Sequence, residues 1–87
     1  DKESSEIYDI KIYVPLLEKN YDVWIPVNKK IYEVIINLVK GINSINKIEY
    51  DIKEIPNLYD KESSEIYDIN VKVIDTNIRN GSEVILL

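Results

Sequence analysis

Cysteine and histidine are absent from this 87-residue sequence. Without thiols there is no disulfide framework and no thiolate zinc site, and without imidazole or thiol side chains the Cys–His and Ser–His nucleophiles are excluded. The only two glycines, Gly41 and Gly81, cannot build a glycine-rich phosphate-binding loop. These absences predict a protein that is not an enzyme and that needs no metal ion and no cofactor.

Long hydrophobic runs and an excess of basic residues are also missing. No apolar run approaches the roughly 20 residues that span a bilayer, and no basic segment leads into an apolar signal core. Acidic residues outnumber basic ones by 16 to 11, and the resulting charge of −5 disfavours binding to nucleic acid. We therefore expect one small cytoplasmic domain that does not insert directly into a membrane.

An identical ten-residue segment occurs twice. DKESSEIYDI is found at residues 1–10 and again at residues 60–69, and the residues after the two copies do not match. One interpretation is that residues 1–7 are a leader without function, an artefact of preparation or sequence assignment or a recent duplication. The other is strand exchange between molecules, which would make the chain a self-associating structural domain and a swapped homodimer.

The first half of the chain predicts a hairpin followed by a helix. Apolar residues alternate with polar ones over residues 10–14 and 23–27, around a turn at residues 16–20, which is typical of two strands. Asn28 is the predicted N-cap. The helix that follows has an apolar face at positions i, i+3, i+4 and i+7 (Ile31, Val34, Ile35 and Leu38), and Gly41 is the predicted left-handed residue at its end.

The second half predicts short strands and a final strand. Residues 42–55 are expected to be a partly irregular connection that can include one helical turn. Residues 57–60 and 65–68 read as a short strand and its return, and Val73 and Ile78 as buried residues of a linking segment that ends in a turn at Asn80–Gly81. The apolar run at residues 84–87 predicts a central strand. A hairpin, a helix and a last strand parallel to the first make an α+β fold of the ubiquitin-like β-grasp type, with a mixed sheet packed on one main helix.

The sequence resembles the ubiquitin superfamily, and most closely the bacterial YukD-like family associated with type VII (WXG100) secretion. The residues that carry the resemblance are NLYDKESSEIYDINVKVIDTNIRNGSEVILL at 57–87, of which NIRNGSEVILL is the most specific, and DIKIYVPLLEKNYDVWIPVNKKIYEVI upstream. The resemblance covers residues 8–87 and leaves only the leader outside.

The resemblance implies a function without chemistry. Conjugating relatives act through a C-terminal Gly-Gly, whereas this sequence ends in Ile85, Leu86 and Leu87, so conjugation and sulfur transfer are not expected. Members of the YukD-like family resemble cytoplasmic accessory or regulatory components. The implied partner is a protein, such as a secretion ATPase or a membrane subunit.

Candidate protein-binding residues lie in three places. Ubiquitin-like domains commonly bind through an apolar patch on the open face of the sheet, which by position would include Leu16, Leu17, Tyr59 and Leu87. Trp24 alternates with Val23 and Ile25 and is either an exposed anchor or a half-buried structural residue. Lys29 and Lys30 are either a solvated pair or a small basic site for an acidic partner.

Four carboxylates gather around the predicted turn after residue 60: Asp60, Glu62, Glu65 and Asp68. Paired acids can hold calcium or serve a glycosidase-type reaction. No EF-hand spacing is present, and a solvated turn is the favoured interpretation.

Overall fold

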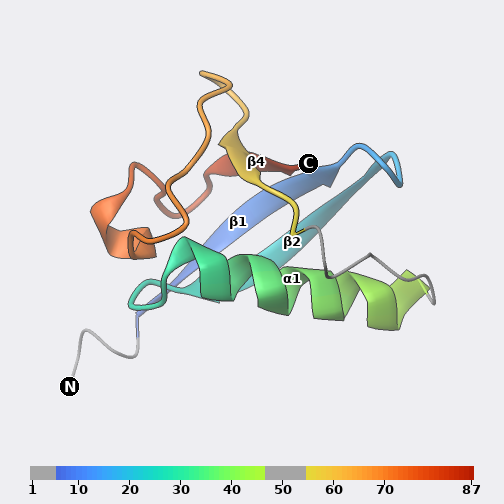
Figure 1. Ribbon diagram of the computed structural model, residues 1–87, viewed down its shortest axis with the longest axis horizontal. Helices are drawn as coiled ribbons and strands as arrows, with labels where there is room; N and C mark the ends of the chain where they lie inside the picture. The colour runs from blue at the N-terminus through green and yellow to red at the C-terminus, as the bar shows by residue number, and fades with distance from the viewer. Residues whose placement is uncertain (1–5, 47–54) are drawn as a thin grey trace.

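The computed structural model describes residues 6–46 and 55–87. In these two ranges, two strands, one long helix, a short strand, a 3-10 turn and a last strand follow one another (Figure 1). Their bounds are β1 at Ile7–Val14, β2 at Lys19–Pro26, α1 at Ile31–Asn46, β3 at Leu58–Asp60, η2 at Val73–Asp75 and β4 at Glu83–Leu86. Within these two described ranges, no helix has the length and apolar character needed to cross a membrane.

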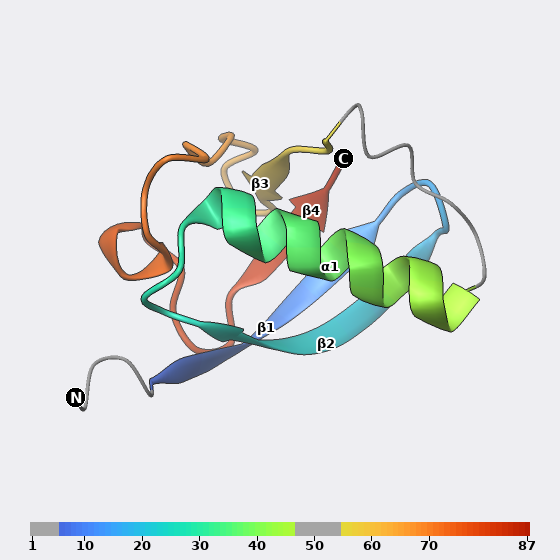
Figure 2. The same cartoon turned by 60° about the horizontal axis from the view of Figure 1, so that its bottom comes forward.

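The four strands form one mixed sheet in the order β2-β1-β4-β3. β1 and β2 are an antiparallel hairpin, and β4 lies parallel to β1, with Val84 opposite Ile12. β3 pairs antiparallel with the other edge of β4. α1 lies across one face of this sheet (Figure 2). The expected α+β class and ubiquitin-like β-grasp fold are confirmed.

The hairpin is longer than the sequence pattern predicts. β1 starts at Ile7, because the Val27 N–H still donates to the Glu6 carbonyl at 3.2 Å and extends the ladder beyond the alternating core positions. Ile7, the last residue of the expected leader, is therefore already in the strand. Residues 1–5 of that leader lie outside the described residues. At the other end of the hairpin, the turn that joins the strands includes Glu18 with a positive φ of 52°.

The start of α1 differs from the expectation. Asn28 is not the N-cap, because the helix begins at Ile31 and the Asn28 Oδ1 atom is buried with no hydrogen-bond partner. Instead, Glu33 Oε1 accepts a hydrogen bond from the Lys30 N–H at 3.2 Å, which is the reciprocal half of a capping box. In the sequence, Glu33, three residues after Lys30, is the feature that indicates this helix start.

The end of α1 also differs. Gly41 is not a left-handed terminal residue, because the helix continues through it to Asn46 and only Gly81, of the two glycines, has a positive φ. Ile42 is 5% exposed, so its burial in the core continues the apolar face by one more turn and outweighs the low helix propensity of glycine. The expected irregular connection at residues 42–55 is thus helical at first, and residues 47–54 lie outside the described residues.

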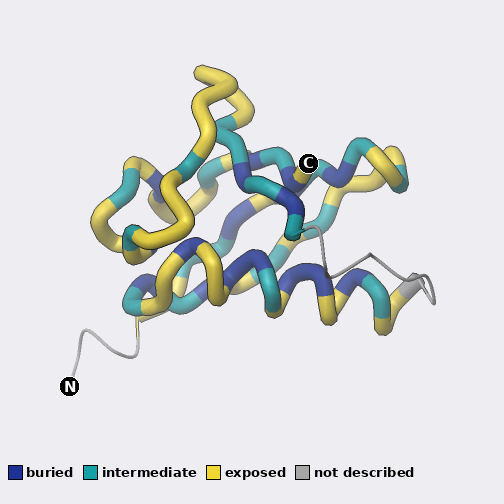
Figure 3. Tube along the Cα trace, in the orientation of Figure 1, coloured by how far each residue is buried: buried dark blue, intermediate teal, exposed yellow. Residues whose placement is uncertain are grey.

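One hydrophobic core lies between α1 and the sheet. The tube in Figure 3 shows the helix buried on the side towards the sheet and exposed on the other. The predicted face of α1 is confirmed, and every second residue of β1 joins it. The buried cluster comprises Ile10, Ile12, Val14, Ile25, Ile31, Val34, Ile35, Leu38, Val39, Ile42, Leu58, Val73, Ile78, Val84 and Leu86.

The two copies of the repeat have different structures. In the first copy Ile7–Ile10 begins β1, whereas in the second Ile66–Ile69 makes only an isolated bridge, between Tyr59 and Ile66. The predicted return strand at residues 65–68 is therefore reduced to that bridge. The Ile69 carbonyl instead accepts a hydrogen bond from the N–H of Tyr32 in the first turn of α1 at 3.0 Å, which satisfies an amide that the helix leaves free.

The segment between β3 and β4 is held by its buried residues and its last turn. Val73 and Ile78 are fully buried, as predicted. The predicted Asn80–Gly81 turn is confirmed by the φ of 89° at Gly81. Asn80 Oδ1 accepts from the Asp9 N–H at 2.8 Å, and the Gly81 N–H donates to the Asp9 carbonyl at 2.7 Å. These two bonds fix where β4 starts beside β1.

Candidate protein-binding surface

An apolar row crosses the open face of the sheet. Tyr13 of β1 lies opposite Ile85 of β4, and Ile85 lies opposite Tyr59 of β3. All three are partly exposed, whereas Val84 and Leu86, on either side of Ile85, are buried against the helix. Because side chains alternate along a strand, the three partly exposed residues point away from α1 and stand side by side. We call Tyr13, Ile85 and Tyr59 the sheet-face row.

Two exposed leucines follow the strands β1 and β4, which carry Tyr13 and Ile85 of this row. Leu87 follows β4 and is 65% exposed, and Leu16, in the turn after β1, is 70% exposed. Figure 1 shows the C-terminus close to the tip of β1, because the two strands run parallel. Leu17 differs from its neighbour: it is partly buried and packs against the core, which favours a structural role for it.

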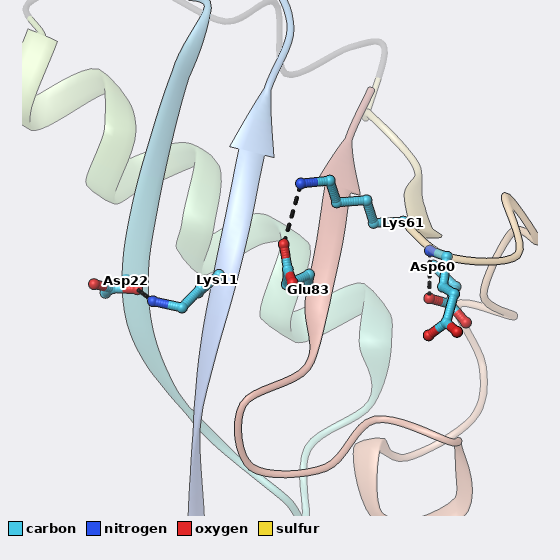
Figure 4. Close-up of polar contacts among 6 residues, drawn as sticks. Lys11, Asp22, Asp60, Lys61 and Glu83 are labelled. Atoms are coloured by element: carbon cyan, nitrogen blue, oxygen red, sulfur yellow. Dashed lines mark hydrogen bonds and ion pairs between the residues drawn. The ribbon is translucent and has the colours of Figure 1, made fainter.

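A charged row lies beside the sheet-face row. Lys11 Nζ contacts Asp22 Oδ1 at 3.2 Å, and Lys61 Nζ contacts Glu83 Oε1 at 3.1 Å (Figure 4). Lys11 and Glu83 are themselves opposite one another in the β1–β4 register. The hydrogen bond and charge of Asp22 raise the pKa of Lys11, so this lysine is charged over the physiological range. Two cations and two anions thus cross the sheet with no net charge.

The remaining predicted binding residues lie elsewhere. Trp24 is 68% exposed, which favours the exposed interpretation. It lies opposite Asp9 of β1, four residues before Tyr13, which is the member of the sheet-face row on that strand. At about 3.3 Å per residue, this is some 13 Å from the sheet-face row. Lys29 and Lys30 are in the loop between β2 and α1. Lys29 Nζ is 4.0 Å from Glu33 Oε2, an exposed pair of small energetic value.

The carboxylate cluster is a structured turn. Asp60 accepts hydrogen bonds from the Glu62 N–H, from Ser63 Oγ and from Asn77 Nδ2, each at 3.1 Å. These bonds lower the pKa of Asp60, and the bond from the Glu62 N–H has the largest effect. Within the ranges 6–46 and 55–87, no group of three or more acidic, Cys or His side chains could hold a metal ion.

Tyr67 completes this turn. Its hydroxyl donates to Asn77 Oδ1 at 2.7 Å, and Asn77 in turn donates to Asp60. Burial, with the negative charges of Asp60 and Glu65 adding to it, raises the pKa of the Tyr67 phenol to about 12. The chain of bonds ties the turn after β3 to the segment after η2, so these polar groups serve to hold the loop.

Two members of the sheet-face row were missed in the sequence. Tyr13 alternates with the buried residues Ile12 and Val14, so its position on the open face could have been inferred from the same pattern that predicts the strand. Ile85 lies in a continuous apolar run, in which no alternation of apolar and polar residues indicates which side chains are exposed. Its exposure follows only from the finding that α1 covers a single face of the sheet.

Comparisons with known proteins give structural matches only: no protein-family model matches the sequence, and no curated protein matches it. The ubiquitin-like domain of the Mycobacterium tuberculosis type VII secretion protein EccD1 gives a TM-score of 0.75 at 11% identity, over 94% of this chain and 98% of that one. A chain of an ESX-5 inner membrane complex gives 0.76 at 9% identity, over 93% of this chain and 20% of that one. This chain therefore spans about a fifth of the length of that relative.

A third similar structure has another context. A chain of a toluene 4-monooxygenase complex gives a TM-score of 0.77 at 6% identity, over 93% of this chain and 96% of that one. At such identities the likeness shows the shared ubiquitin-like fold, and function has to be argued from the surfaces.

Proposed function

We propose that this chain is a non-conjugating ubiquitin-like protein-binding module and a cytoplasmic accessory or regulatory component of a bacterial type VII secretion system, of the YukD-like kind. It acts by docking, with no bond made or broken. The observation that carries the proposal is the sheet-face row, an apolar strip on the side of the sheet opposite α1. Aromatic and aliphatic side chains held on a rigid strand are the usual anchors of a protein interface.

The structural relatives support the secretion context. EccD1 is a type VII secretion protein of Mycobacterium tuberculosis, and EccD5 of Mycobacterium xenopi has a similar ubiquitin-like domain. The ESX-5 match is a chain of an inner membrane complex. We propose by analogy that the partner here is a secretion ATPase or a membrane subunit.

The charged row beside the apolar one specifies how a partner would dock. Lys11 and Lys61 are neutralised by Asp22 and Glu83, so the sheet face presents no strong field of one sign. A partner therefore gains little from charge steering and most from covering the row of Tyr13, Ile85 and Tyr59. Polar groups of the partner that lie over the two ion pairs would set its orientation.

The test is partner capture from a lysate of the source cell, with the domain immobilised and retained proteins identified by mass spectrometry. We compare the wild type with the Tyr59→Ala, Leu87→Ala double variant, and use Trp24→Ala as the matched control, because Trp24 is about as exposed as Leu87 but lies away from the row. Circular dichroism checks that each variant is folded. The proposal expects a secretion ATPase or membrane subunit on the wild type and on the control, and its loss on the double variant.

Two results would refute the proposal. Equal capture by all three proteins would place the interface elsewhere. Recovery of only the chain itself would favour a self-associating domain, and a concentration-dependent dimer that disappears when residues 1–6 are deleted would assign this association to the repeated segment.

A further inference from the structure

Trp24 is an exposed aromatic residue that the proposed docking surface does not include. It lies on β2 between Val23 and Ile25, and both of these neighbours pack on the core. Because side chains alternate along a strand, Trp24 projects from the open face of the sheet, opposite α1. A large aromatic side chain that the core does not need is a candidate for contact with a ligand.

Asp9 of β1 lies directly opposite Trp24 in the hairpin register. The backbone of Asp9 bonds on the side away from β2: its N–H donates to Asn80 Oδ1 at 2.8 Å, and its carbonyl accepts from the Gly81 N–H at 2.7 Å. Asp9 and Trp24 are therefore a non-hydrogen-bonded pair, the antiparallel arrangement in which facing side chains are closest. The carboxylate and the indole thus lie side by side on the open face.

The Asp9 carboxylate is incompletely satisfied. Its Oδ1 atom is buried without a hydrogen-bond partner, and the ion pairs within the ranges 6–46 and 55–87 join other residues. A buried acceptor without a donor costs free energy, so a ligand that supplies a donor is favoured. Asp9 is only partly buried as a residue, and rotation of its carboxylate exchanges the two oxygens, so a ligand beside Trp24 can reach it.

The charges around this pair favour a cation. Lys11, two residues along β1 from Asp9, is already paired with Asp22, and the other ion pair of the charged row is neutral as well (Figure 4). Asp9 therefore leaves a local charge of −1 beside Trp24, in a chain whose total charge is −5. On the β4 side of Asp9 lies Gly81, where an added Cβ would meet no atom within 4 Å, so the space there is open.

We propose that Trp24 and Asp9 form a binding site for an arginine side chain of a protein partner. The guanidinium group stacks on the indole and donates to the Asp9 carboxylate. Arginine is favoured over lysine because its planar group does both at once, whereas the compact ammonium group of lysine does not stack. The site lies about 13 Å from the sheet-face row, so its occupant is a different segment from the one that covers the row, and the proposed function does not depend on it.

The probe is N-acetyl-L-arginine amide, titrated into the isotope-labelled chain while amide and indole NMR shifts are followed. Trp24 is the only tryptophan of the chain, so its indole N–H signal is unambiguous. Two analogues are matched controls. N-acetyl-L-citrulline amide keeps the planar group without the charge, and N-acetyl-L-lysine amide keeps the charge without the planar group.

The arginine amide is expected to shift the indole N–H of Trp24 and the amides of Asp9 and Gly81 together, along one saturating curve. At equal concentration the lysine amide should give shifts at least twofold smaller, because it lacks the stacking contact. The citrulline amide should give no saturating shift, because it lacks the charge that the carboxylate binds.

Variants separate this site from other surfaces. Asp9→Asn removes the charge and keeps the backbone bonds, and Trp24→Leu keeps an apolar side chain without the aromatic face; each should reduce the arginine-induced shifts at least threefold. Glu65→Gln removes one exposed negative charge elsewhere and should leave them unchanged. The Tyr59→Ala, Leu87→Ala double variant should respond like the wild type, so a failure of the sheet-face row is distinguishable from a failure of this site.

Three results would overturn the proposal. Shifts that do not saturate, or that are equal for the lysine amide, would show only the general attraction of a cation to an acidic chain. Equal losses in Glu65→Gln and Asp9→Asn would mean the same. Shifts that are largest in the turn after β3 would place the cation at that turn instead.

Discussion

Gly41 offers a test in which the sequence pattern and the structure predict opposite results. If Gly41 were the left-handed residue at the end of the helix, alanine there would be strained. In the structure it lies inside α1, its φ is not positive, and a Cβ would meet open space. Alanine is favoured over glycine in an exposed helix interior by about 0.8–1.0 kcal/mol, so Gly41→Ala should stabilise the chain by roughly that amount.

The expected size can be measured. For a domain of this length, about 1 kcal/mol corresponds to a rise of roughly 4–8 °C in the melting temperature. Thermal and urea unfolding followed by far-ultraviolet circular dichroism gives both numbers. Gly81→Ala is the matched control, because Gly81 has a φ of 89° and an alanine in a left-handed conformation costs about 1–2 kcal/mol. A Gly41→Ala variant that melts lower than the wild type would refute helical geometry at Gly41, and with it the extent of α1.

Three further predictions concern the core and the turn after β3. Leu58→Ala should lower the free energy of unfolding by about 2–5 kcal/mol in urea titrations, because Leu58 is fully buried, and a loss under 1 kcal/mol would contradict its place in the core. Folding lowers the pKa of Asp60, so its contribution to stability is present above a pH of about 3.8 and is lost as the pH falls through the pKa of the folded state. The wild type should therefore lose more free energy of unfolding on acidification than Asp60→Asn. Parallel curves of stability against pH would count against the hydrogen bonds of this turn. The pKa of Tyr67 is raised to about 12, so stability should fall as the pH rises from about 10 to 12, and Tyr67→Phe should remove that slope in unfolding curves recorded at alkaline pH.

The fold could be predicted from the sequence because its signals are local and agree with one another. The alternation in residues 10–14 and the helical spacing from Ile31 to Leu38 each point to one buried face, and the structure buries those faces against each other. The Asn80–Gly81 turn was predicted for the same reason, since glycine readily takes a positive φ.

The errors lie where tertiary contacts outweigh local preference. Glycine and asparagine suggest a helix end at Gly41, but burial of Ile42 continues the helix. Asn28 has the chemistry of an N-cap, yet the first helical amides are satisfied by Glu33 and by the carbonyl of Ile69, which is 37 residues away from Tyr32 in the sequence. No local pattern could reveal that partner.

The candidate surfaces were only partly predictable for a related reason. Tyr59 pairs with Ile85 on the open face, and Leu87 and Leu16 are exposed just after β4 and β1, whereas Ile85 lies in an apolar run of the sequence that gives no sign of its exposure. An apolar cleft between β2 and α1, lined on the helix side by Gly41, Ile42 and Ile45, depends on how far α1 extends, so a helix expected to end at Gly41 does not predict it. Trp24 was singled out as a candidate, but its position on an edge strand of the sheet follows only from the strand order.

The most direct test of the central claim is the affinity of the captured secretion partner for the domain, measured by isothermal titration calorimetry for the wild type, for Tyr59→Ala, Leu87→Ala and for Trp24→Ala. Interface anchors of this type cost about 1–2 kcal/mol or more on truncation, so the double variant should bind at least tenfold more weakly, with Trp24→Ala unchanged. Equal affinity for the wild type and the double variant would contradict the assignment of the open sheet face as the docking surface.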